Sequence, residues 1–297
     1  MRHFLEIDDL STEELWEVLR LAKETHPAPV LAGQGGALLF EKPSLRTRNS
    51  MEMATVALGG HPISVMADEV GLDTRESVED VTRTLAGYHA FIGARVFNHQ
   101  HLERMVAVNQ LPIVNLLSDA AHPMQALADL LTIEDHFGAL DVSVAYIGDA
   151  NNVARSLAIA TLMTGGTFTI AAPEDYSFSD SDAEYISKHG RFTQTTSPAE
   201  AVVGAHVIYT DVWTSMGQEV ERAARLAAFS NFTITETLLE HSAANSIFLH
   251  CLPAHRGEEV SEAVLEGERS KVWAQAENRM HAARGLLWWL MSQQKGA

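Results

Sequence analysis

Residues 142–152 read Val-Ser-Val-Ala-Tyr-Ile-Gly-Asp-Ala-Asn-Asn, an apolar run followed at once by a polar loop. A short apolar run of this kind predicts a buried strand, and a helical pattern follows the loop. Similar runs occur at residues 37–40, 111–116, 168–171, 207–209 and 247–249. Because short apolar strands separated by amphipathic helices are typical of βαβ units, we expect an α/β protein with parallel sheets.

The chain has 297 residues, which is enough for one large domain or two ordinary ones. A domain boundary is predicted near residues 137–140, where one helical pattern ends and a new strand begins. The formal net charge is −18, from 21 basic and 39 acidic side chains. This balance disfavours nucleic acid and anionic membranes as partners, although a few arginines can still form a local site for an anionic substrate.

Cysteine usage and the lack of targeting signals predict a cytoplasmic protein. Cys251 is the one cysteine, so a disulfide within the chain is impossible, which fits a reducing compartment. The first residues lack the apolar segment of a secretory signal. No apolar run approaches the roughly 20 residues that a membrane helix needs, and residues 286–291 are instead expected to form a C-terminal helix packed on the core.

Four polar segments follow predicted strands, where ligands of parallel sheets bind. The first, residues 41–48, reads Glu-Lys-Pro-Ser-Leu-Arg-Thr-Arg. Hydroxyls, arginines and backbone N–H groups at a helix start suit an anion. The alternative is an ordinary capped helix with surface arginines. The segment lacks the glycines and the Gly-Lys pair of the nucleotide-hydrolase phosphate loop.

The second segment is residues 122–125, His-Pro-Met-Gln, where a histidine can polarise a carbonyl and a glutamine can bond an amide. The alternative is a loop histidine beside a capping glutamine. The third is residues 250–257, His-Cys-Leu-Pro-Ala-His-Arg-Gly. Its cysteine can be a nucleophile, a proton acceptor or a small buried residue. A metal site is disfavoured, because the chain has a single thiol. The bond before Pro253 is a candidate for a cis peptide.

The fourth segment, residues 211–219, follows the apolar run that ends at residue 209 and offers a carboxylate, a hydroxyl and a glycine. These groups suit a small cationic substrate, and the alternative is an acidic loop that caps the next helix. Residues 148–152 lack the second and third glycines of the dinucleotide fingerprint. NAD binding is therefore disfavoured.

Five segments, taken in order, resemble the motifs of the aspartate/ornithine carbamoyltransferase family: residues 44–48, 122–125, 211–217, 250–253 and 277–280. The resemblance extends from about residue 40 to about residue 281. It implies two doubly wound parallel-sheet α/β domains. Residues 1–137 would bind carbamoyl phosphate, residues 138–276 would bind ornithine, and a C-terminal helix at about 277–297 would return to the first domain. It also implies a homotrimer with active sites at subunit interfaces, with a larger assembly left open.

The family reaction transfers the carbamoyl group of carbamoyl phosphate to the δ-amine of L-ornithine and needs neither a cofactor nor a metal. By resemblance, the catalytic residues are Arg46, His122, Asp211 and Cys251. The carbamoyl-phosphate site would comprise Ser44, Leu45, Arg46, Thr47, Arg95, His122, Gln125, Cys251, Leu252 and Arg279. The ornithine site would comprise Leu117, Asn152, Asp211, Ser215 and Met216.

Two departures from the family pattern keep alternatives open. Leu45 replaces the usual threonine, as in some relatives that act on acylated ornithines, so a sister enzyme for acylated ornithine or putrescine is the alternative function. Residues 67–75 contain Glu69 where many members present a glutamine or histidine to a neighbouring subunit. Since a carboxylate would repel phosphate, we hypothesise that Arg75 serves the neighbour instead. A catalytically silent binding subunit is a further alternative, disfavoured because the main catalytic positions are filled.

Overall fold

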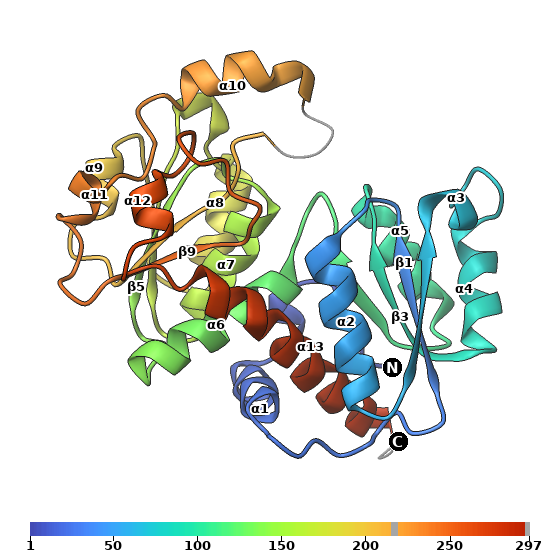
Figure 1. The fold of residues 1–297 in the computed structure, drawn as a ribbon. Coiled ribbons are helices and arrows are strands. Elements are labelled where there is room, and N and C mark those ends of the chain that lie inside the picture. The colour runs from blue at the N-terminus through green and yellow to red at the C-terminus, as the bar shows by residue number, and fades with distance from the viewer. Residues whose placement is uncertain (215–218, 295–297) are drawn as a thin grey trace. The chain divides into compact units, whose positions relative to one another are not determined.

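The computed structural model describes residues 1–214 and 219–294, and the chain forms two compact units. The first comprises Met1–Leu131 and Glu277–Ala297, and the second comprises Thr132–Ala276. Each unit contains a parallel sheet with helices beside it (Figure 1). The predicted fold class is confirmed, because the sheets have four and five parallel strands and a long helix ends the chain.

The sheet of the first unit has the order β2-β1-β3-β4, and every neighbouring pair is parallel. Its strands are β1 (Gly35–Phe40), β2 (His61–Met66), β3 (His89–Arg95) and β4 (Ile113–Leu117). The helices are η1 (Ile7–Asp9), α1 (Thr12–Ala22), α2 (Leu45–Ala57), α3 (Ala67–Val70), α4 (Val78–Ala86), α5 (His99–Val108), α6 (Pro123–Phe137) and α13 (Val272–Gln294). The two divisions between the units fall inside α6 and inside the first turns of α13, and the predicted boundary at residue 137 is the last residue of α6.

The sheet of the second unit has the order β7-β6-β5-β8-β9, again with every neighbouring pair parallel. Its strands are β5 (Ser143–Ile147), β6 (Thr167–Ala171), β7 (Phe192–Thr195), β8 (Val207–Thr210) and β9 (Ile247–His250). The helices are α7 (Asn152–Met163), η2 (Glu174–Tyr176), α8 (Asp180–Ser187), α9 (Pro198–Ala201), η3 (Glu219–Glu221), α10 (Arg222–Ala228), α11 (Glu236–Leu239) and α12 (Glu262–Leu265). The strand order reverses between β5 and β8, which is where ligands bind in open α/β sheets.

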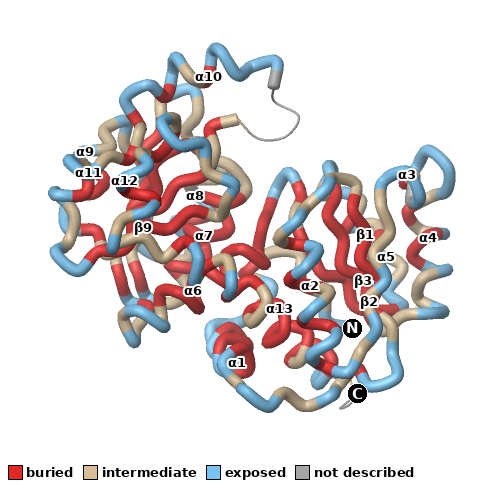
Figure 2. Tube along the Cα trace, viewed as in Figure 1, coloured by how far each residue is buried: buried red, intermediate tan, exposed pale blue. Residues whose placement is uncertain are grey.

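The core of each unit lies along its sheet, where Figure 2 shows the central strands as buried. β8 is buried along its whole length, and so is β9 although it lies at a sheet edge, whereas the edge strands β2 and β7 are partly exposed. Buried strands of this kind read as continuous apolar runs in the sequence, because helices cover both faces of a parallel sheet. In the described part of the chain, no helix has the length and apolar character needed to cross a bilayer.

The C-terminal helix α13 packs closely on α1 within the first unit. Arg284 donates hydrogen bonds to the backbone carbonyls of Ala22, at 2.6 Å, and Glu24, at 2.7 Å. A Cβ atom added at Gly285 would lie only 2.5 Å from the carbonyl oxygen of Val18. Glycine at this position therefore permits the close approach of the two helix backbones.

Replacing Gly285 with alanine tests this packing. Alanine favours a helix by about 1 kcal/mol over glycine, but the added methyl group would meet backbone atoms that cannot move aside. We expect Gly285→Ala to lower the free energy of unfolding by about 1–3 kcal/mol, measured by urea denaturation. The control is Gly87→Ala, because Gly87 has a right-handed φ of −72° and its added Cβ would lie 3.4 Å from its nearest neighbour. Equal stabilities of the two variants would contradict the packing argument.

Candidate active site

The first predicted segment forms the start of α2 in the first unit. Ser44 caps this helix, and its hydroxyl accepts a hydrogen bond from the Thr47 N–H at 3.3 Å. Thr47 is buried, Arg46 is half-buried, and Leu45 is 76% exposed. A helix start presents backbone N–H groups and a partial positive charge, which favour an anion.

Arg279 of α13 connects three segments of the first unit. Its guanidinium donates to the Thr47 hydroxyl at 3.0 Å and to the amide oxygen of Gln125. The amide nitrogen of Gln125 donates to a carboxylate oxygen of Asp129 at 2.8 Å. Because Asp129 can only accept and Arg279 can only donate, these two bonds fix which end of the Gln125 amide is oxygen. All four side chains are buried.

Two further predicted residues of the first unit, Arg95 and His122, are also buried. Arg95 ends β3, and His122 precedes α6. Burial lowers the pKa of His122 well below its usual value, and the positive charges of Arg279 and Arg95 lower it further. His122 is therefore a neutral imidazole near pH 7, which can form hydrogen bonds without adding a positive charge.

This shift in the pKa of His122 predicts a stability effect in acid. In the unfolded chain the imidazole takes up a proton near pH 6.5, whereas in the folded protein it does so only well below that value. Since the unfolded state then binds more protons, the free energy of unfolding falls as the pH drops below about 6.5. We expect urea denaturation of His122→Asn to show a smaller loss of stability over this acid range than the wild type. Identical pH dependence would contradict the prediction.

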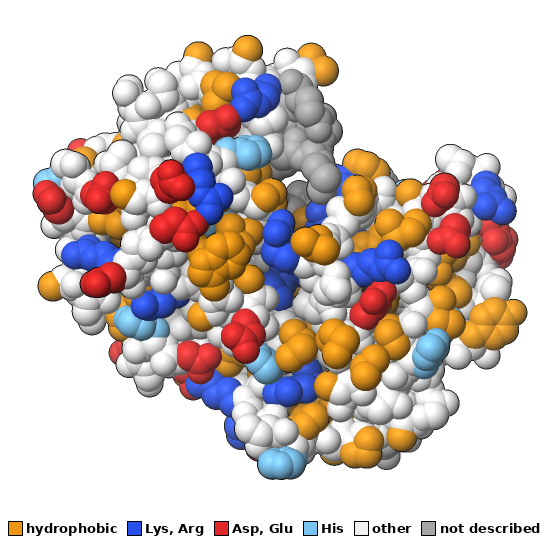
Figure 3. Space-filling model, viewed as in Figure 1, with side chains coloured by type: hydrophobic (Ala, Val, Ile, Leu, Met, Phe, Trp, Pro, Cys, Tyr) orange, Lys and Arg blue, Asp and Glu red, His pale blue; other side chains and the backbone are white. Residues whose placement is uncertain are grey.

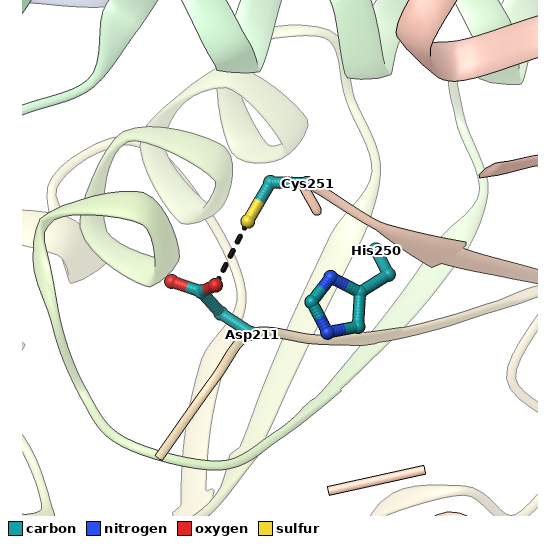
Figure 4. A group of neighbouring side chains, drawn as sticks. All are labelled: Asp211, His250 and Cys251. Carbon is teal, nitrogen blue, oxygen red and sulfur yellow. Dashed lines mark hydrogen bonds between the residues drawn. The ribbon is translucent and has the colours of Figure 1, made fainter. Parts of the chain in front are cut away.

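In the second unit, the Asp211 carboxylate accepts hydrogen bonds from groups that follow three neighbouring strands. One oxygen accepts from the Cys251 thiol at 2.9 Å and from the Val212 N–H at 2.8 Å. The other accepts from the Asn151 amide at 3.0 Å. Figure 4 shows the Cys251 sulfur pointing toward Asp211, with the His250 ring bonded to neither. Asp211 is only 8% exposed, so a charged acceptor lies preorganised at the reversal of strand order.

Arg225 of α10 holds the chain just before the segment 215–218. Its guanidinium donates to the carbonyl of Trp213 at 3.1 Å and to the Asp149 carboxylate at 2.8 Å. Its Cζ atom lies 4.9 Å from the centre of the Tyr176 ring. Burial raises the pKa of Asp149, and Arg225 opposes that rise. The predicted residues Ser215 and Met216 lie outside the described residues.

The remaining predicted residues occupy separate places in the two units. Leu117 is half-buried at the end of β4. Asn152 opens α7, and its amide oxygen accepts the Val153 N–H at 3.1 Å. The Leu252–Pro253 peptide is cis, and the Leu252 N–H donates to the Nδ1 atom of His250 at 2.9 Å.

Five residues that contact predicted site residues, or their neighbours in the chain, were not predicted from the sequence. They are Asp129, Asn151, Arg225, Glu259 and Gln275. Asp129 follows Gln125 by four residues, a helical spacing that places the two side chains on one face and could have indicated the pair. Asn151 adjoins the predicted Asn152. Nothing local indicated Arg225, Glu259 or Gln275.

Comparisons with known proteins identify the family of the chain. The carbamoyl-phosphate-binding domain model of the aspartate/ornithine carbamoyltransferases matches residues 2–135, and the Asp/Orn-binding domain model matches residues 140–290. The chain therefore belongs to the aspartate/ornithine carbamoyltransferase family.

Three individual proteins of known name are similar to this chain over nearly its whole length. The ornithine carbamoyltransferase of Haloquadratum walsbyi is 45% identical over 98% of both chains. The solved ornithine carbamoyltransferase of Pyrococcus furiosus is 40% identical, with a TM-score of 0.94 over 98% of this chain and 97% of that one. A structure of an N-acetyl-L-ornithine transcarbamylase is 26% identical, with a TM-score of 0.89 over 98% of this chain and 100% of that one.

Proposed function

We propose that this protein transfers the carbamoyl group of carbamoyl phosphate to the δ-amine of L-ornithine, giving L-citrulline and phosphate without a cofactor or a metal. The observation that carries the proposal is the buried Asp211 carboxylate beside Cys251 and Asn151. A buried anion suits the α-ammonium of ornithine, whereas aspartate would bring a second carboxylate and an acylated ornithine has no α-ammonium. The higher identity to relatives named ornithine carbamoyltransferase supports the same acceptor.

The carbamoyl-phosphate half of the reaction is assigned to the first unit. Ser44, the Leu45 N–H, Arg46, Thr47 and Arg95 bind the phosphate, because charge-assisted hydrogen bonds suit a dianion. Arg46, Thr47 and His122 polarise the carbonyl oxygen. A neutral His122 can donate one N–H to that oxygen as negative charge develops.

The carbamoyl amine is assigned to the amide oxygen of Gln125, which Arg279 orients, and, by resemblance to the family, to the backbone of Cys251 and Leu252. The bond from Gln125 to Asp129 supports this assignment, because it keeps the amide nitrogen of Gln125 away from an N–H donor. The amide oxygen, which already accepts from Arg279, has a second lone pair for the amine.

The acceptor amine is assigned to the second unit. Asp211 and Ser215 hold the α-ammonium of ornithine, while Asn152 and the backbone near Met216 hold the carboxylate, with Leu117 beside the substrate. The δ-amine has a lysine-like pKa of about 10 and must lose a proton before attack. That proton goes to Cys251 as the thiol passes its own proton to Asp211, or it goes to solvent while the Cys251 sulfur orients the amine by accepting an N–H.

The acceptor is tested by measuring citrulline and related carbamoyl products with a panel of amines. The panel contains L-ornithine, putrescine, N-acetyl-L-ornithine and L-aspartate at matched concentrations. We expect kcat/KM for ornithine to exceed the others by at least about 100-fold. N-acetylornithine would leave Asp211 unpaired, the second carboxylate of aspartate would be repelled, and putrescine lacks the carboxylate assigned to Asn152 and the backbone near Met216. A value for putrescine or N-acetylornithine equal to that for ornithine would contradict the proposal.

Asp211→Asn separates the two substrates. Loss of a buried charge-assisted hydrogen bond costs about 1.5–3 kcal/mol, so we expect the KM for ornithine to rise by about ten- to a hundredfold. The KM for carbamoyl phosphate should change by less than about threefold, since Asp211 has no assigned role in its binding. The matched control, Asp141→Asn, removes an exposed carboxylate of the same unit and should keep wild-type kinetics. An equal effect on both KM values would count against the assignment.

We further propose a cytoplasmic homotrimer with active sites at subunit interfaces. The first unit exposes large apolar side chains on α2 and on the edge strand β2, which favour association: Leu45, Met53, Val56 and Ile63. Figure 3 shows hydrophobic side chains spread over the face of this unit that carries α2.

Arg75 remains the residue proposed to serve a neighbouring subunit. Its guanidinium donates to the carbonyls of Asp68 and Glu69, at 3.2 and 3.1 Å, and so lies over the start of its own loop. The Glu69 carboxylate instead accepts the Met66 N–H at 2.9 Å. A carboxylate would repel phosphate, whereas both of these Arg75 bonds use a single terminal nitrogen and leave the other N–H groups of the guanidinium for an anion, which favours Arg75.

Arg75→Ala tests both the interface and the residue. We expect the KM for carbamoyl phosphate to rise at least about tenfold, as for the loss of one charged hydrogen bond. Light scattering should still give three times the chain mass of 32.5 kDa. Arg83→Ala, which removes an exposed arginine of α4, is the control. A monomeric wild type, or an unchanged KM in Arg75→Ala, would overturn this part of the proposal.

A further inference from the structure

A buried glutamate closes the loop that contains Cys251. The Glu259 side chain is completely buried. One oxygen of its carboxylate lies 3.0 Å from the Nε2 atom of His250 and accepts the backbone N–H of His255 at 2.6 Å. The same carboxylate oxygen therefore contacts a residue before the Cys251–Ala254 loop and a residue after it.

The hydrogen bonds of His250 define its tautomer. The Leu252 N–H points at Nδ1, at 2.9 Å, so Nδ1 must be the acceptor and carries no proton. Nε2 must then carry the proton of the neutral ring and donate it to Glu259. An ionised carboxylate can only accept hydrogen bonds, so Glu259 favours the tautomer that carries its proton on Nε2. In the other tautomer an Nδ1–H would face the Leu252 N–H, and two donors would meet.

The bond to Nδ1 holds an unusual backbone conformation. Leu252 has a φ of +58°, in the left-handed region that side chains other than glycine rarely adopt. Such a conformation persists only where surrounding contacts enforce it. The other contacts of His250 also fix its position, because its N–H donates to Gln275 at 2.9 Å and Gln275 donates to the Tyr209 hydroxyl at 3.1 Å.

We propose that Glu259 is a positioning residue for the transfer reaction. It acts through the His250 tautomer to set the direction of the Cys251 and Leu252 backbone groups, which are assigned above to the carbamoyl amine. Glu259 itself touches neither Cys251 nor Asp211 through any hydrogen bond in the described residues. The inference rests on the proposed function, because it requires that this loop contact a reactant.

A purely structural role is the competing explanation. In that case Glu259 would serve only to hold His255 and close the loop, and its replacement would change stability without changing the turnover of folded enzyme. Glu259→Gln separates the two roles, because glutamine keeps the size and an acceptor oxygen but can also donate to Nε2 and so permit the wrong tautomer. Because the His250 ring is neutral, this replacement leaves no unpaired charge in the interior.

The kinetic test compares Glu259→Gln with Glu258→Gln in the full-length enzyme, using whichever amine the wild type carbamoylates. Displacing a group that orients a reactant costs about ten- to a hundredfold, so kcat at saturating substrates should fall by that factor. The KM for the amine should stay within about threefold, since Asp211 keeps its bonds. Glu258 forms an ion pair with Arg222 and a contact with the exposed His255 ring, so its variant should keep the wild-type kcat.

A double-mutant cycle shows whether Glu259 acts through His250. The asparagine of His250→Asn can place its oxygen near the position of Nδ1 but cannot reach Glu259. In this background Glu259→Gln should change kcat by less than about threefold, which indicates coupling. A wild-type kcat for Glu259→Gln, or the same loss in both backgrounds, would overturn the inference.

If Glu259→Gln does not fold, Glu259→Asp takes its place, because it retracts the carboxylate by one methylene group and should lose kcat only when His250 is present. Failure of the proposed function would appear differently, as a wild type that carbamoylates none of the amines tested.

Discussion

The hydrogen bonds of the Arg279 guanidinium are the interaction on which the first unit depends. They join α13 to Thr47 of α2 and Gln125 of α6, across separations of 232 and 154 residues. A buried arginine is costly unless its donors are paired, so the C-terminal helix is held against the rest of the unit by the need to satisfy this charge. The same bonds orient Gln125 and Thr47. The contacts that pack α13 on the first unit therefore also orient side chains of the proposed carbamoyl-phosphate site.

The second unit also contains a buried charge whose hydrogen bonds must be satisfied, but here the charge is negative. Asp211 is kept ready for a cation by donors from the loops after β5, β8 and β9. These loops meet because the strand order reverses between β5 and β8. Two further side chains hold the loops that flank Asp211. Arg225 donates to the carbonyl of Trp213 after β8, and Glu259 contacts the His250 ring at the end of β9. Charge is thus fixed in each unit before either substrate binds, which reduces the reorganisation that catalysis would require.

Local sequence was sufficient for the parts of this arrangement that burial controls directly. The apolar runs of β1, β4, β5, β6, β8 and β9 predicted strands, because both faces of those strands are covered. Three strands were not predicted. The edge strands β2 and β7 are only partly buried, and Gly93 interrupts β3 where Leu38 and Leu116 pack close to its backbone. Short polar motifs at strand ends indicated the chemistry, since those residues lie together in the chain.

The residues that orient the site could not be found in the same way, because their partners are distant in sequence. Arg225 reaches Asp149 across 76 residues, and Gln275 reaches Tyr209 across 66. Sequence position alone also did not show which of two adjacent asparagines would contact Asp211. Asn151 is the neighbour that contacts Asp211, whereas the predicted Asn152 bonds the start of α7.

Calorimetric titration of carbamoyl phosphate into Arg279→Lys measures whether the hydrogen bonds of the guanidinium prepare the carbamoyl-phosphate site. Lysine keeps the charge but cannot form two bonds in the fixed geometry of a guanidinium. Arg284→Lys on the same helix is the control, because Arg284 contacts backbone carbonyls of residues 22 and 24. We expect at least tenfold weaker carbamoyl-phosphate binding by Arg279→Lys and wild-type binding by the control. Wild-type affinity in a folded Arg279→Lys variant would contradict it.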